Sequence, residues 1–227
     1  MSRPTRDKDG AAPAQQESER RRGGRRTARL VSACPGHYGR RVREFGSSSL
    51  SLGGSLLISH PSLLDPNFRK TVIFLSTHDP EEGSFGLILN RPAGRTVGDV
   101  LPNKPIGALA RVPLFLGGPV SGDQLVFAAF RWHPESERME CRHHLLIPDA
   151  QKAIEEEHTT VRAFIGYAGW TKGQLEGELA QKAWLVGKPG REVLAVEKLP
   201  VLWREVTSSF GPWFRLVAEA PDDPAQN

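Results

Sequence analysis

The stretch Thr71-Val-Ile-Phe-Leu-Ser-Thr77, together with the later stretch Phe85-Gly-Leu-Ile-Leu-Asn90, decides the fold class. Both are short apolar runs, and the first is rich in β-branched residues, which favours strands over helices. The segment Asp79-Pro-Glu-Glu-Gly83 lies between them and is made of turn-forming residues. Two strand-like runs joined by a short polar turn predict an antiparallel hairpin.

Outward from this hairpin, further short apolar runs predict strands. We expect them at residues 54–59, 112–116, 125–132, 145–147, 161–167 and 184–186. The pair Arg91-Pro92 and the triplet Gly117-Gly-Pro119 each end one of these runs, because proline cannot donate to a strand ladder.

Helix signals are fewer than strand signals. We expect a short helix or turn at residues 96–101. Asp149 after Pro148 predicts a helix cap, with the helix continuing to residue 157. Thr171 and Gln174 have the spacing of a capping box for a helix ending near residue 182. A last helix is expected over 199–210, where Gly211-Pro212 stops it.

The order of these elements predicts the architecture. Strands and helices do not alternate regularly, as they would in a doubly wound parallel sheet. We therefore expect an α+β fold, with a mainly antiparallel β-sheet flanked by a few helices. It forms a single domain over residues 46–227.

Residues 1–45 have a different composition. They carry a net charge of +7, and since the whole chain carries +4, the remainder carries −3. Such an Arg-rich segment cannot bury enough apolar surface to fold, so we expect a disordered tail. It is either a tether to nucleic acid or an anionic surface, or an upstream extension without a role. The mildly acidic domain itself argues against phosphate-mediated nucleic-acid binding.

The composition also bears on location. Hydrophobic residues make up 38% of the chain, and no apolar run approaches the roughly 20 residues of a membrane helix, so no membrane contact is expected. The two cysteines, Cys34 and Cys141, are split between tail and domain, which favours a reducing compartment. The tail lacks the apolar centre of a secretion signal. We expect a cytoplasmic protein.

A family resemblance comes from a set of segments in fixed order. They are Gly54-Ser-Leu-Leu-Ile-Ser-His-Pro61 with Asp65-Pro-Asn-Phe68, Gly86-Leu-Ile-Leu-Asn-Arg-Pro92, Phe115-Leu-Gly-Gly-Pro-Val120, Gly166-Tyr-Ala-Gly-Trp170 with Gly173-Gln-Leu-Glu176, and Asp223-Pro-Ala-Gln-Asn227. This ordered pattern resembles the YqgE/AlgH family of bacterial cytoplasmic proteins. The resemblance implies an α+β fold built on antiparallel sheet. It implies little about activity, because the family's label of transcriptional regulator rests on no DNA-binding motif.

The sequence departs from the family pattern in the Arg-rich tail, which lies outside the resemblance, and at one place within the domain. Family members usually have a strand ending in Leu-His after the Gly-Gly-Pro-Val segment, whereas Ala129-Phe130 stand here. A role built on that histidine is therefore in doubt for this chain.

Candidate ligand-binding residues stand where expected strands end, since such ends gather into clefts. They are Asp65, Asn67, Asn90, Arg91, Gly117, Gly118, Trp170 and Gln174. Arg91 can hold a carboxylate or phosphate, and Asn90 can hydrogen-bond a polar ligand. The alternative is turn and packing chemistry, for which the same residue types are used everywhere.

The only residues that resemble a metal-binding set are His133, Cys141, His143 and His144. A structural zinc site usually has four ligands in tight pairs, which this spacing lacks. We expect solvent-exposed histidines on an irregular loop, no metal and no cofactor.

Known catalytic motifs are absent from the sequence, including the phosphate-binding loop, the dinucleotide fingerprint, the zinc-protease helix motif and the nucleophile elbow. We therefore expect a non-enzymatic protein that binds a small ligand or a protein partner and acts in regulation. Two alternatives stay open. One is a hydrolase or transferase of unfamiliar type using Asp65, Asn90 and Arg91, and the other is a transcriptional regulator that contacts DNA through the tail.

Overall fold

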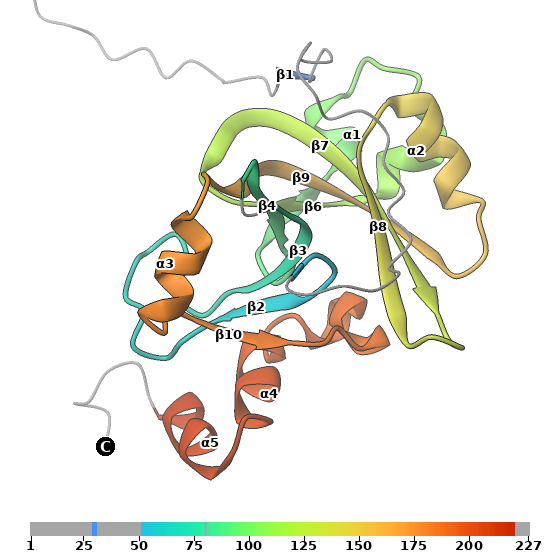
Figure 1. Ribbon diagram of the computed structural model, residues 1–227. Coiled ribbons are helices and arrows are strands. Elements are labelled where there is room, and N and C mark those ends of the chain that lie inside the picture. The colour runs from blue at the N-terminus through green and yellow to red at the C-terminus, as the bar shows by residue number, and fades with distance from the viewer. Residues whose placement is uncertain (1–28, 31–50, 80, 221–227) are drawn as a thin grey trace, which may run out of the picture.

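The computed structural model describes residues 29–30, 51–79 and 81–220 (Figure 1). The strands are β1 (Arg29–Leu30), β2 (Leu56–Ser59), β3 (Val72–Asp79), β4 (Gly83–Ile88), β5 (Pro92–Thr96), β6 (Pro113–Leu116), β7 (Val120–His133), β8 (Arg138–Leu145), β9 (Thr159–Trp170) and β10 (Trp184–Gly187). The α-helices are α1 (Val97–Val100), α2 (Ile147–Ile154), α3 (Gln174–Ala180), α4 (Leu202–Ser208) and α5 (Pro212–Glu219). Short 3₁₀ helices cover Gly107–Arg111, Arg191–Leu194 and Val196–Lys198.

All these strands belong to one curled 10-stranded sheet. Its main path runs β1-β7-β9-β4-β3-β2-β10, with β8 added to β7, β6 to β9 and β5 to β6. Only the pairs β1–β7 and β6–β9 are parallel among the described strands. The expected α+β class, with a mainly antiparallel sheet and flanking helices, is confirmed.

The hairpin expected from residues 71–90 is β3 and β4. The two strands pair antiparallel from Ile73 opposite Ile88 to Asp79 opposite Gly83, with a register shift between Leu75 and Thr77. The apolar side chains of β3 are buried from Val72 to Leu75, which explains why this stretch defines the fold so clearly.

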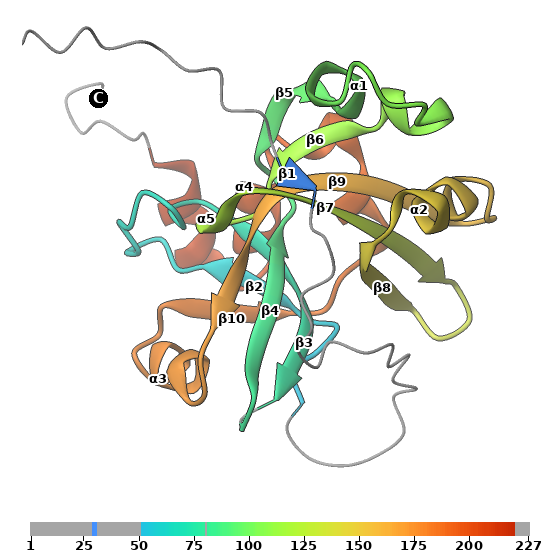
Figure 2. The same cartoon turned by 90° about the horizontal axis from the view of Figure 1, so that it is seen from above.

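Strands β7 and β9 separate two apolar layers. On one face, Phe127 and Ala163 pack with Ala150 and Ala153 of α2. On the other face, a larger cluster joins the inner side of the curled sheet to Trp203 of α4. A third cluster lies under α3. Helices α1 and α2 lie at the opposite end of the molecule from α3 and α5 (Figures 1 and 2).

The expected short strand at residues 145–147 is wrong. Strand β8 covers Arg138–Leu145 and pairs along β7, with Cys141 opposite Phe130 and Arg138 opposite His133. Charged residues alternate with Met139 and Cys141 in β8, so its apolar content is too low to stand out. The expected irregular loop carrying the histidines is wrong for the same reason.

Two helix starts also differ from expectation. Helix α2 begins at Ile147, with Pro148 in its first turn, so Asp149 lies inside the helix rather than at its cap. Helix α3 begins at Gln174 after Gly173, which has a φ of 72°. The expected contact still forms, because Gln174 Oε1 accepts a hydrogen bond from the Thr171 backbone N–H at 3.1 Å.

Helix α4 ends at Ser208, before the stop expected at Gly211-Pro212, and this pair instead begins α5. Helix α5 covers Pro212–Glu219, with its proline in the first turn, where the missing N–H costs nothing. The expectation of a single helix over 199–210 therefore missed one helix.

Most of the expected tail and the domain boundary at residue 46 lie outside the described residues. Within the tail, Arg29–Leu30 forms β1, parallel to β7 with Arg29 opposite Gln124. In the described part of the chain, no helix is both long and apolar enough to cross a membrane.

Candidate functional site

The loop containing Asp65 and Asn67 is held by Arg91. The Arg91 guanidinium donates hydrogen bonds to the carbonyl oxygens of Pro66, Asn67 and Arg69 at 3.1, 2.6 and 3.1 Å. Asp65 Oδ1 accepts a hydrogen bond from the Asn67 N–H at 2.7 Å. Burial lowers the pKa of Arg91, while the nearby Asp65 charge raises it. The guanidinium therefore holds the loop in place at the end of β4.

Asn90 continues the pairing of β3 beyond the end of β4. Its Oδ1 accepts a hydrogen bond from the Val72 N–H, and its Nδ2 donates to the Lys70 carbonyl, both at 2.9 Å. The side chain thus imitates one more backbone unit of the hairpin. Both ends of the amide are used by the fold.

Gly117 and Gly118 lie where β6 passes close to β9. A Cβ on Gly117 would stand 2.2 Å from the Gly166 carbonyl oxygen, and one on Gly118, where φ is +152°, would stand 2.2 Å from the Tyr167 carbonyl carbon. Only glycine allows this approach. The Gly117 carbonyl also accepts the Ile88 N–H at 3.0 Å, so this corner adjoins the end of β4.

Trp170 and Gln174 belong to a separate cluster around Glu178 of α3. Trp170 and Trp184 both donate their indole N–H to Glu178 Oε2, at 2.8 and 2.7 Å. Gln174 Nε2 donates to Glu178 Oε1 at 3.0 Å. Phe68 links this cluster to the Arg91 loop, since its ring stacks on Trp170 with centroids 6.5 Å apart.

The structure therefore brings together five of the predicted site residues, Asp65, Asn67, Asn90, Arg91 and Gly117, with Gly118 next to them. Trp170 and Gln174 lie in a second cluster. Their polar contacts serve the fold. None of them lines either of the two cavities described below. Their role in ligand binding stays a prediction.

Nothing in the sequence indicated a row of three polar side chains, Ser84, His78 and Glu176, that lie next to one another. Ser84 Oγ lies 2.9 Å from His78 Nδ1, and Glu176 Oε1 lies 3.5 Å from His78 Nε2. In serine hydrolases the order is reversed, with Nε2 toward the serine and Nδ1 toward the acid. His78 and Ser84 are directly opposite each other in the β3–β4 hairpin, so an ordinary cross-strand contact explains their hydrogen bond.

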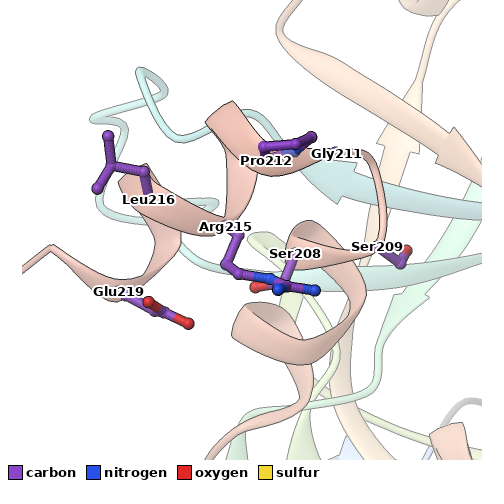
Figure 3. A pocket seen from close by; sticks show the side chains of 7 residues that line it. All are labelled: Ser208, Ser209, Gly211, Pro212, Arg215, Leu216 and Glu219. Atoms are coloured by element: carbon purple, nitrogen blue, oxygen red, sulfur yellow. The ribbon is translucent and has the colours of Figure 1, made fainter.

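A shallow cavity of about 410 Å³ lies on the α4–α5 pair (Figure 3). It is lined by Ser208, Ser209, Gly211, Pro212, Arg215, Leu216 and Glu219. Figure 3 shows Arg215 extending toward Ser208, with Leu216 at the outer end. Leu216 is 71% exposed and Trp213 is 55% exposed, so α5 presents an apolar side to solvent.

A larger groove of about 670 Å³ lies between the start of β9 and the segment 191–198. It is lined by Trp132, His158, Thr159, Thr160, Arg191, Glu192, Leu194, Ala195, Glu197 and Lys198, and we call it the β9 groove. Its volume is within the range of small-ligand sites. An aromatic ring, two hydroxyls and charges of both signs line it.

Arg162 does not line the β9 groove itself but is hydrogen-bonded to one of the residues that do. It follows Thr160 by two residues on β9, so both side chains share one face of the strand. Its Nη2 donates to the carbonyl oxygen of Leu194, which lines the groove, at 2.8 Å. Its Nη1 donates to the Leu89 carbonyl at 3.1 Å, and its guanidinium carbon lies 4.5 Å from the Phe115 ring centre.

The charge of Arg162 is not neutralised by a described residue. The side chain is 1% exposed, and its Nε has no hydrogen-bond partner in the described part of the chain. Burial lowers the pKa of Arg162 to about 10, which still leaves a cation at neutral pH. A buried charge without a counter-ion is costly, so its presence calls for a reason.

The sequence contained one signal for Arg162. A single arginine interrupts the otherwise apolar and small residues that follow Thr160 in β9. Charged residues are rarely buried unless they are paired, so an arginine inside a strand-like run marks a position worth testing. The expectation for that strand gave Arg162 no role.

The suspected metal residues are separated by the hairpin. His133 Nε2 lies 2.9 Å from Glu140 Oε2, at the turn end of β7–β8, away from His143 and His144 near the other end of β8. Burial raises the pKa of the Cys141 thiol to about 12, so it is not a reactive thiolate. Among the residues that the structure describes, no group of three or more His, Cys, Asp or Glu side chains could hold a metal ion.

The fold and groove define a class of protein, a curled-sheet α+β domain in which one long strand bears a buried cation behind a surface groove. The chain belongs to the AlgH-like family, whose pattern matches residues 56–215. The expected family resemblance is therefore confirmed.

Relatives and solved structures agree with this assignment. A UPF0301 protein of Streptomyces coelicolor is 37% identical over 194 residues, covering 78% of this chain and 96% of the relative. A UPF0301 protein of Stutzerimonas stutzeri is 41% identical over 142 residues, covering 57% of this chain and 72% of the relative. The solution structure of the AlgH protein from Pseudomonas aeruginosa, at 26% identity, has a TM-score of 0.55 and covers 79% of this chain and 100% of that one. The crystal structure of protein DIP2367 from Corynebacterium diphtheriae, at 20% identity, has a TM-score of 0.58 and covers 78% and 95%.

Ala129 and Phe130, where the family resemblance leads us to expect Leu-His, are core residues in this chain. Ala129 is 1% exposed and Phe130 is 0% exposed, on opposite faces of β7. A histidine at the second position would lie inside the larger apolar cluster.

Proposed function

We propose that this protein is a non-enzymatic binding protein that takes a small anionic ligand in the β9 groove and acts in regulation. One observation carries the proposal: Arg162 is fully buried, has no carboxylate partner among the described residues, and bonds the wall of the groove through Leu194. An anion in the groove would supply the missing counter-charge. Arg162 is shielded from water, so its attraction for an anion is screened less than the attraction between two exposed charges.

The charges on the groove rim shape the ligand further. Arg191 and Lys198 add positive charge, while Glu192 and Glu197 add negative charge. Lys198 Nζ also pairs with Glu205 Oε2 at 3.2 Å. The ligand that fits best directs its anionic end toward Arg162 and presents hydrogen-bond donors to the two glutamates. Thr159 and Thr160 offer hydroxyl groups on the strand side of the groove.

The strand-end residues that the sequence suggested as ligand-binding residues are less suited to bind a ligand than the β9 groove is. Arg91, Asn90 and Asp65 direct their polar atoms to backbone groups of the same chain. A ligand there would have to break these contacts, each of which stabilises the loop by about 1 kcal/mol or more. This comparison favours ligand binding in the β9 groove over catalysis at the strand-end residues.

We also propose that the protein works in the cytoplasm. The support is that Cys141, the one cysteine among the described residues, is a free thiol, which suits a reducing compartment. Contact of the 1–45 tail with nucleic acid stays a prediction, and deletion of that tail followed by salt-dependent DNA retention tests it.

The ligand proposal is tested by thermal shift at constant ionic strength, with inorganic pyrophosphate, inorganic phosphate and succinate as probes. A probe at 10 times its Kd stabilises the fold by about 1.4 kcal/mol. For a chain of this size we expect the Tm to rise by about 3–6 °C. Arg191→Gln combined with Lys198→Gln should remove most of this rise.

The matched control is Lys188→Gln, which removes one exposed positive charge just outside the groove lining. It should keep the full rise in Tm. If no probe raises the Tm, or if the groove variant and the control respond alike, the groove does not bind anions and the proposal fails.

A further inference from the structure

Two neighbouring histidines on β8 face each other. Successive side chains of a strand normally point to opposite faces of the sheet. His143 and His144 instead bring their Nδ1 atoms to 2.7 Å from each other, with ring centroids 4.9 Å apart. The sequence placed both residues on an exposed irregular loop, where such a pairing is not expected.

A β-bulge produces this arrangement. Phe127 of β7 pairs with Leu145, whereas the next residue, Ala128, pairs with His143, so His144 is the extra residue of β8. His144 has a φ of 55°, in the left-handed region that non-glycine residues seldom adopt. Bulges often re-aim a side chain, and strained residues of this kind concentrate at functional sites.

The two imidazole rings pack against aromatic side chains. The His143 ring stacks on Phe85 with centroids 4.4 Å apart, and the His144 ring lies 5.0 Å from Phe85 and 6.3 Å from Tyr167. Burial lowers the pKa of His143 to about 4, with a contribution from His144, and burial also lowers the pKa of His144. A neutral imidazole ring has one N–H and one nitrogen lone pair, so each ring can offer one nitrogen to a metal ion.

We propose that His143 and His144 bind one divalent transition-metal ion of the copper and nickel type through their Nδ1 atoms. Neutral imidazole nitrogen is a preferred ligand of such ions. At metal–nitrogen distances of about 2.0–2.1 Å, two nitrogens 2.7 Å apart subtend an angle of about 80–85° at the metal.

This angle selects the type of ion. An angle near 90° matches adjacent positions of a square-planar or tetragonal ion such as Cu²⁺ or Ni²⁺. A tetrahedral Zn²⁺ would need the two nitrogens about 3.3–3.4 Å apart, and the rings would have to give up part of their packing on Phe85 to reach that distance. The described residues include no third ligand for such an ion, so water or an external donor would fill the remaining positions.

The step is balanced without loss of protons at neutral pH. In the metal-free pair, one ring donates its Nδ1–H to the Nδ1 of the other. On binding, the donor ring carries its proton on Nε2 instead, and both Nδ1 lone pairs bind the ion.

The test is calorimetry of the full chain with Ni²⁺, and electron paramagnetic resonance with Cu²⁺. We expect one ion per chain and a copper spectrum split by two nitrogens. The variants are His143→Phe, which keeps the stacking on Phe85, and His144→Asn, which tolerates a positive φ. Each should weaken Ni²⁺ binding at least tenfold and remove the two-nitrogen splitting.

The matched control is His133→Ala, on the same hairpin but paired with Glu140 at its far end. It should leave Ni²⁺ affinity and the copper spectrum unchanged, and circular dichroism checks that all three variants keep the fold. Unchanged Ni²⁺ affinity in His143→Phe and His144→Asn overturns the proposal. Tighter binding of Zn²⁺ than of Cu²⁺ overturns the assigned geometry.

Discussion

The guanidinium of Arg162 donates a hydrogen bond from Nη2 to the carbonyl oxygen of Leu194 at 2.8 Å, which ties strand β9 to the segment that walls the groove. Its Nη1 bonds Leu89 at 3.1 Å, next to the Asn90-Arg91 corner. One buried cation thus connects the groove with the end of β4. The interior of the protein contains a charge that stability alone does not require.

Replacement of Arg162 by methionine separates function from stability. We expect Arg162→Met to fold, because an apolar side chain of similar length often replaces a buried charge with little loss of stability. Pyrophosphate affinity, measured by calorimetry, should fall at least tenfold. Arg162→Ala should instead lower the free energy of unfolding by about 3–5 kcal/mol, because it also leaves a cavity. An Arg162→Met protein with unaltered pyrophosphate affinity would show that the charge serves packing alone.

Arg91 should matter for the stability of the loop that it holds. Arg91→Ala removes three charge-assisted hydrogen bonds to backbone carbonyls, and we expect the free energy of unfolding in urea to fall by about 2–3 kcal/mol. Amide exchange should quicken over residues 66–69. The exposed Arg111→Ala is the control and should change stability by less than about 0.5 kcal/mol. Equal effects of the two variants would contradict the role of Arg91.

The close approach of β6 and β9 should not tolerate a methyl group. Gly117→Ala places a Cβ 2.2 Å from the Gly166 carbonyl oxygen, so the two strands must separate. We expect a loss of about 3 kcal/mol or more, seen as a lower urea midpoint. Gly122 has open space where its Cβ would be. Gly122→Ala is therefore the control, and a comparable loss there would show that the approach is not the cause.

The histidine pair should make stability depend on pH. Because burial lowers the pKa of His143 to about 4 from the ordinary histidine value of 6.5, the unfolded chain binds more protons than the folded chain between these pH values. Stability is then fully present above about pH 6.5 and falls as the pH drops toward 4. His143→Phe should flatten this part of the curve of unfolding free energy against pH. A curve of unchanged slope would mean that other groups dominate acid unfolding.

The sequence predicted those parts of the fold whose signals are local. Residues 71–77 are β-branched and apolar, so β3 was found, and the following turn and β4 completed the hairpin. Strand β8 was missed because its inward residues Met139 and Cys141 alternate with the charged residues Arg138, Glu140 and Arg142. Helix α5 was missed because a Gly-Pro pair can mark a helix end as well as a helix start, and here Gly211-Pro212 begins α5.

The site was harder to predict than the fold. Arg91, Asn90 and Gly117 were found as strand-end residues, and they do gather, but their contacts to backbone groups depend on partners distant in sequence. The charge of Arg162 could not be read as buried from the sequence alone, because its burial comes from the packing of β9 against Leu89 and Leu194. The His143–His144 contact depends on a bulge, which only the pairing with β7 reveals.

The most direct measurement is an amide chemical-shift map of the protein during titration with pyrophosphate at constant ionic strength. If an anion enters the β9 groove, the largest changes should occur at Thr159, Thr160, Leu194 and Ala195. Changes centred on Asn67, Asn90 and Arg91 would instead place the ligand at these strand-end residues. An unchanged spectrum would mean that the buried charge of Arg162 attracts no anion at all.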